Sequence, residues 1–75
     1  MTREETKALM AILKAAYPNF YKDISKEEAK AAVDLWATMF ADTPAILVIE
    51  AVKSLICTLK YPPTIADVKE KIHLL

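Results

Sequence analysis

The segment from Pro44 to Lys60 is apolar around almost its whole circumference when it is drawn as a helix. Its few polar side chains recur at spacings of three and four residues, so they form one narrow stripe. They are Glu50, Lys53, Ser54 and Thr58. A helix of this kind has to be covered by other segments on several sides. The β-branched run from Ile46 to Ile49 is also typical of a strand, but the length of the segment and the proline at its start favour a helix.

The rest of the chain is divided into three further helices by cap signals and prolines. Thr2 and Ser25 each precede a glutamate by three residues, and Thr64 precedes Asp67 in the same way, which is the pattern of a capping box. Prolines end the first and third helices. We therefore predict an all-α, compact four-helix bundle-like domain with helices at about residues 3–16, 26–41, 44–59 and 65–74. The short break after residue 41 predicts that the two middle helices pack antiparallel or at a steep angle.

The chain has 75 residues, which suffices for one small domain. Domains of this size usually need a disulfide, a metal or very good helix packing. The only cysteine, Cys57, cannot form an internal disulfide, and no Cys/His group has metal-ligand spacing. We expect Cys57 to be an ordinary core residue in a reducing, cytoplasmic compartment. Neither a signal peptide nor a membrane-spanning run is recognisable, so no membrane partner is expected.

Aromatic residues gather in the connector that follows the first predicted helix, which holds half of the six in the chain. We expect Phe20 and Ile24 to cover the core there, and Trp36 to lie in the core at mid-helix. Tyrosine is often an anchor in protein interfaces, so exposed rings at the loop ends are candidates for a partner surface. The candidate partner-binding residues are Tyr17, Tyr21, Lys22 and Tyr61.

The polar residues form no pattern that is typical of catalysis. Most carboxylates lie in the first turns of predicted helices, where capping accounts for them, and His73 lies near a helix end. The chain has no glycine, which excludes phosphate-binding Gly loops and nucleophile elbows. We therefore expect a non-enzymatic protein that needs no metal and no other cofactor.

Nucleic-acid binding is a second possibility, since small helical domains often bind DNA. Ten basic and ten acidic residues balance, so little counterion release is available to drive such binding, and no direct nucleic-acid contact is expected. Two alternatives to a protein-binding adaptor stay open: a small DNA-binding replication or regulatory module, and a structural oligomerisation domain.

Several short segments form an ordered set along the chain. They are AAYPNFY at 15–21, LWA at 35–37, MFAD at 39–42, AVK at 51–53 and YPPTIADVKEKI at 61–72. In order and spacing this set resembles the folded N-terminal domain of the phage replicative-helicase loader/inhibitor family, found in phages and prophages of Gram-positive bacteria.

The resemblance implies a compact helical domain and an adaptor role in phage DNA replication inside the bacterial host cell. Such proteins bind the hexameric replicative helicase, restrain its activity and help deliver it to an origin marked by a phage initiator protein. They contact the helicase largely through a flexible C-terminal segment. Residues 1–75 are therefore expected to be the N-terminal domain of a protein with a tail that this sequence lacks. The initiator and a second copy of the chain are then candidate partners of the folded surface.

Overall fold

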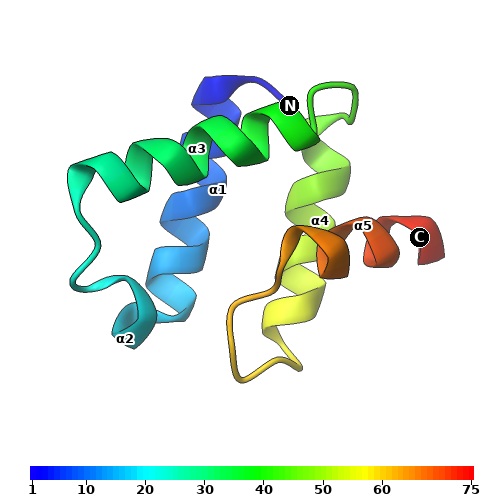
Figure 1. Cartoon of the computed structure of the whole chain (residues 1–75). Helices are drawn as coiled ribbons and strands as arrows, with labels where there is room; N and C mark the ends of the chain where they lie inside the picture. The colour runs from blue at the N-terminus through cyan, green and yellow to red at the C-terminus, as the bar shows by residue number, and fades with distance from the viewer.

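The computed structural model describes all 75 residues, and every regular element in it is a helix. The helices are α1 (Arg3–Ala16), α2 (Pro18–Tyr21), α3 (Lys26–Met39), α4 (Ala45–Ile56) and α5 (Ile65–Leu74), shown in Figure 1. The predicted all-α class is confirmed, and the four predicted helices correspond to α1, α3, α4 and α5. The short α2 was not predicted; it lies in the aromatic connector and begins at its proline.

The start of α4 differs from the prediction by one residue. Pro44 is the N-cap, with an extended backbone, instead of the first helical residue, and it offers no side chain to cap the helix. The Pro44 carbonyl accepts hydrogen bonds from the amides of Leu47 (3.1 Å) and Val48 (3.4 Å). The helix ends at Ile56, earlier than predicted, because the amides of Cys57 and Thr58 bond to carbonyls only three residues back.

Side-chain caps start the other long helices as the sequence predicts. The Thr2 hydroxyl accepts from the Glu5 amide at 3.1 Å, while the Glu5 carboxylate accepts from the Thr2 amide at 2.7 Å. The same reciprocal pair joins Thr64 and Asp67 at the start of α5, at 3.1 and 2.9 Å. At the start of α3 only the bond to the Ser25 hydroxyl forms.

Replacing Thr64 by alanine is expected to lower the free energy of unfolding by about 1 kcal/mol, because α5 loses a side-chain cap. For a domain of this size that corresponds to a fall in Tm of roughly 4–8 °C, measured by circular dichroism. The control is Ser54→Ala, which removes an exposed hydroxyl from within α4. Equal melting of the two variants would contradict a capping role for Thr64.

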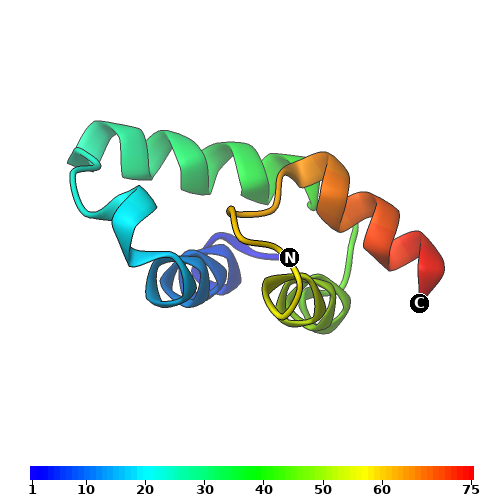
Figure 2. The ribbon, with the colours of Figure 1, turned by 90° about the horizontal axis from the view of Figure 1, so that it is seen from below.

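The helices form two crossed layers (Figures 1 and 2). Helices α1 and α4 lie side by side, and α3 and α5 cross the same face of this pair. Two hydrogen bonds show that α1 and α4 point in the same direction. The Met1 ammonium donates to the Thr43 carbonyl (2.6 Å) at one end, and the Tyr17 hydroxyl donates to the Leu59 carbonyl (2.9 Å) at the other. Helices α3 and α4 follow each other at a steep angle, one of the two predicted arrangements.

The core lies between the two layers. Its buried members are Leu9, Leu13, Tyr17, Phe40, Val48, Ala51, Val52 and Val68. Trp36 is half-buried and packs against this cluster, with its ring centroid 5.7 Å from that of Phe40, so its predicted place is confirmed.

Helix α4 is covered less completely than its composition predicts. Val48, Ala51 and Val52 are buried, but Ile46 is 69% exposed, and Cys57 is exposed instead of lying in the core. Both predictions are wrong for the same reason: α1 and α5 pack against one side of α4, and nothing covers the opposite side.

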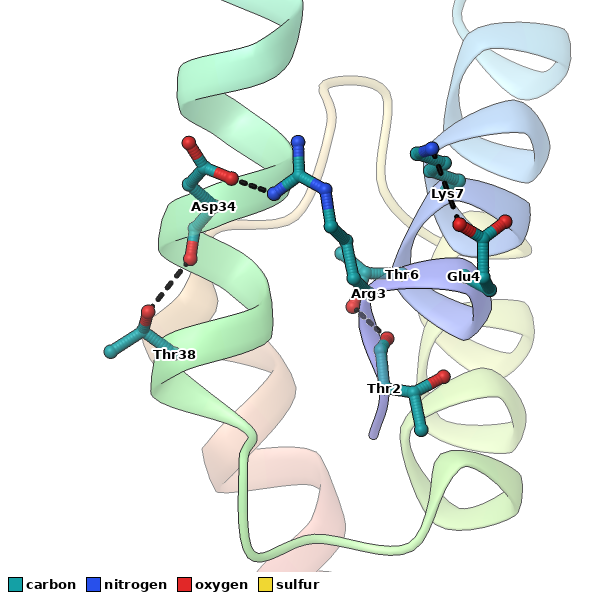
Figure 3. Close-up of polar contacts among 7 residues, drawn as sticks. All are labelled: Thr2, Arg3, Glu4, Thr6, Lys7, Asp34 and Thr38. Carbon is teal, nitrogen blue, oxygen red and sulfur yellow. Dashed lines mark hydrogen bonds and ion pairs between the residues drawn. The ribbon is translucent and has the colours of Figure 1, made fainter.

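Polar contacts join the start of α1 to α3 (Figure 3). Arg3 forms an ion pair with Asp34, whose carbonyl accepts a hydrogen bond from the Thr38 hydroxyl at 2.8 Å. The hydroxyl of the buried Thr6 donates to the Thr2 carbonyl at 2.7 Å. The ion pair is exposed to solvent, so it stabilises the fold by about 1 kcal/mol at most.

None of the five helices has both the length and the apolar character needed to span a lipid bilayer.

Candidate partner-binding surface

Tyr17 stands where α1 ends and joins that end to the residues after α4. Its side chain is only 7% exposed, and its hydroxyl donates to the Leu59 carbonyl at 2.9 Å. Burial raises the pKa of the Tyr17 phenol above its ordinary value. Tyr17 is therefore a core residue, and the prediction that its ring is exposed is wrong.

Two exposed rings lie against this buried tyrosine. The Phe20 ring meets Tyr17 edge to face at a centroid distance of 6.4 Å, and meets Tyr61 in the same way at 5.6 Å. Phe20 is 53% exposed and Tyr61 is 68% exposed. We call the set Tyr17, Phe20 and Tyr61 the aromatic corner. It brings together segments that are about 40 residues apart in the chain, and each edge-to-face pair adds roughly 0.5–1.5 kcal/mol beyond area burial.

The placement of Phe20 corrects the prediction that it covers the core. Helix α2 starts at Pro18 and directs Phe20 toward Tyr61, while the next residue, Tyr21, lies against a different part of the molecule. The spacing could have indicated this, because Phe20 follows Tyr17 by three residues and the proline between them can begin a short helix.

Tyr21 is half-buried and lines a small apolar cavity of about 90 Å³ between α1, α2 and α3. The other lining residues are Met10, Lys14, Ile24, Ala29, Ala32 and Val33. Burial raises the pKa of the Tyr21 phenol. Ile24 is half-buried at this cavity, where it covers the interior as predicted. Tyr21 also lines an open hollow beside Phe20, so it adjoins the aromatic corner.

Lys22 is exposed and lies on another side of α2. It lines an open hollow with Lys14 and Pro18, at the junction of α1 and α2. Of the four predicted site residues, the structure therefore joins Tyr17 and Tyr61 through Phe20, places Tyr21 beside them, and directs Lys22 to a separate surface.

The aromatic corner has the features of a small protein-binding surface. Exposed aromatic rings on a fixed support supply much of the binding energy in protein interfaces. The support here is the buried Tyr17 ring, whose hydroxyl is already hydrogen-bonded to Leu59. Because the rings are held before a partner arrives, little side-chain entropy is lost on binding. No group of three or more His, Cys, Asp or Glu residues lies close enough to hold a metal ion.

Comparison with known proteins identifies the family. The family model for the N-terminal domain of gp39P-like phage helicase loader/inhibitor proteins matches residues 1–69, which include the aromatic corner and helices α1 to α4. No curated protein and no solved structure matches the chain. The family match confirms the resemblance that the ordered segments indicate. The chain therefore belongs to the gp39P-like family of phage helicase-associated proteins and corresponds to the N-terminal domain of that family.

Proposed function

We propose that this domain is the folded part of a non-enzymatic adaptor in phage DNA replication. The adaptor binds the hexameric replicative helicase, restrains its activity, and helps load it at an origin marked by a phage initiator protein. The observation that carries this proposal is the family match over residues 1–69.

The proposal divides the two contacts between two parts of the protein. A flexible segment after the folded domain binds the helicase, and the aromatic corner binds the initiator. Support for the second contact comes from the exposure of Phe20 and Tyr61 and from the prior ordering of their rings. Such a surface provides apolar contact area and one phenol hydroxyl at its centre.

Binding alone is sufficient for both restraint and loading. An adaptor that binds the inactive form of the helicase more tightly than the active form holds the enzyme inactive by that difference in affinity. An initiator that competes for the adaptor then releases the helicase at the origin. The adaptor makes and breaks no covalent bond in this scheme.

Binding to a replicative helicase with ATP bound tests the proposal directly. Two forms should be titrated: residues 1–75, and the same residues with whatever sequence follows Leu75. The longer form is expected to bind the helicase and to be displaced by the initiator. Residues 1–75 are expected to bind the initiator alone. If neither form binds either protein, the proposed function is wrong.

Removing both exposed rings, by Phe20→Ala with Tyr61→Ala, is expected to weaken initiator binding at least tenfold. Each truncated aromatic anchor usually costs more than about 1 kcal/mol of binding free energy, and about 1.4 kcal/mol corresponds to a factor of ten. Isothermal titration calorimetry measures the change.

The matched control for this double variant is Leu35→Ala on α3, because Leu35 and Phe20 are both 53% exposed. The control should bind the initiator normally, and all variants should keep most of their thermal stability. Equal weakening by Leu35→Ala would show that the aromatic corner is not the binding surface.

A further inference from the structure

The outward side of α4 carries four exposed residues in one line. They are Ile46, Glu50, Lys53 and Cys57. Their spacings of four, three and four residues place them within roughly 60° of one another around the helix. The opposite side of α4 carries Val48 and Val52, which are buried against the rest of the domain. In Figure 2 the uncovered side of α4 faces away from the layer formed by α3 and α5. We call these four residues the α4 stripe.

The charges and the apolar groups of the α4 stripe have no partner within the domain. The ion pairs of the structure are Arg3–Asp34 and Lys7–Glu4, so neither Glu50 nor Lys53 is paired. Ile46 is 69% exposed, and Leu47 beside it is also exposed. The middle of the stripe is therefore charged with both signs, and its ends are apolar.

The order of these groups is complementary to its own reverse. Read forward, the stripe is apolar, acidic, basic and apolar; a reversed copy presents apolar, basic, acidic and apolar. Opposite an antiparallel copy, Glu50 faces Lys53, Lys53 faces Glu50, and Ile46 faces Cys57. An interface around a two-fold axis must be self-complementary in this way, and a spacing of three and four residues is that of paired helices.

We propose that α4 pairs with the α4 of a second copy of this chain, antiparallel and around a two-fold axis. A parallel pair is unfavourable because it places Glu50 against Glu50 and Lys53 against Lys53. The antiparallel pair also brings Leu47 of each copy toward the half-buried Ile56 of the other, which adds apolar area beside the stripe.

The size of α4 sets the strength of this pairing. Its 12 residues span about 18 Å, so the contact is smaller than a standard protein interface. We expect a dissociation constant on the order of 0.1–1 mM, at the weak end of specific association. Measurement therefore needs protein concentrations of about 1 mM.

Charge reversal tests the pairing by sedimentation equilibrium. Glu50→Lys alone and Lys53→Glu alone are each expected to weaken self-association at least tenfold, because like charges then face each other. An equimolar mixture of the two variants is expected to associate again, since the two lysines of one variant face the two glutamates of the other. Both residues are exposed, so both variants should melt close to the unchanged chain.

Oxidative cross-linking tests the orientation. Ile46→Cys is expected to form disulfide-linked dimers through Cys57 of the second copy. The unchanged chain should not, because the two Cys57 residues are separated along the helix by about 16 Å, whereas a disulfide needs Cα atoms about 4.4–6.8 Å apart. Ile46→Cys with Cys57→Ser is the control and should form no disulfide-linked dimer.

Three results would overturn the proposal. They are a chain that is monomeric at every concentration, an association that is unaffected by either charge reversal, and cross-linking of the unchanged chain through Cys57. Self-association requires neither helicase nor initiator, so these results are independent of the test of the proposed function.

Discussion

Replacing Phe40 by alanine is expected to leave a large part of the domain unfolded. Phe40 is 1% exposed and is the largest fully buried side chain. Its ring packs against Trp36, and the Lys69 ammonium nitrogen lies 4.9 Å from its centroid. A buried Phe→Ala change costs about 3–5 kcal/mol. A 75-residue domain has a total stability of only about 4–11 kcal/mol, so the loss consumes much of it.

Urea denaturation followed by circular dichroism measures this effect. The matched control is Phe20→Ala, which makes the same chemical change at a residue that is 53% exposed. We expect the control to lose about 1 kcal/mol or less, because little buried area is removed. Similar losses for the two variants would show that the core is not placed around Phe40.

Replacing Tyr17 by alanine is expected to have the second largest effect, about 3–4 kcal/mol. The ring fills the space between the end of α1 and the residues after α4, and its hydroxyl donates to the Leu59 carbonyl. Tyr17→Phe keeps the ring and loses only this hydrogen bond, which costs about 1–1.5 kcal/mol. Urea denaturation of both variants separates the ring from the hydroxyl. Equal losses would assign the whole effect to the hydroxyl and contradict the packing role.

Alkaline pH gives a further readout of the same hydroxyl. The pKa of Tyr17 is raised in the folded state, so folding favours the protonated phenol. Its contribution to stability is complete below about pH 10, the ordinary pKa of tyrosine, and is lost as the pH rises through the raised pKa. The unchanged chain should therefore lose more stability than Tyr17→Phe when the pH is raised above about 10.

The parts of the fold that depend on local sequence could be predicted. The bounds of α1 and α5 follow from Thr2 and Thr64, whose hydroxyls bond to amides only three residues away. The coverage of α4 could not be predicted in this way. Ile46 and Val48 are both β-branched and apolar, and only the positions of α1 and α5 decide that one is exposed and the other buried.

The candidate site was predicted in location but not in its assignment of residues. The connector after α1 and the residue Tyr61 were predicted, and both take part in the aromatic corner. The exchange of roles between Tyr17 and Phe20 was missed because it depends on a hydrogen bond from Tyr17 to Leu59, 42 residues away. Neither residue type indicates by itself which ring will be buried.

The parallel direction of α1 and α4 has an electrostatic consequence. Each helix carries about half a positive charge at its start and half a negative charge at its end, so the two macrodipoles add at both ends of the pair. Glu4 and Glu5 lie in the first turn of α1, while Lys14 and Lys53 lie in the last turns of α1 and α4. These lysines therefore offset the field of the backbone near the aromatic corner, and their presence there does not require an anionic partner.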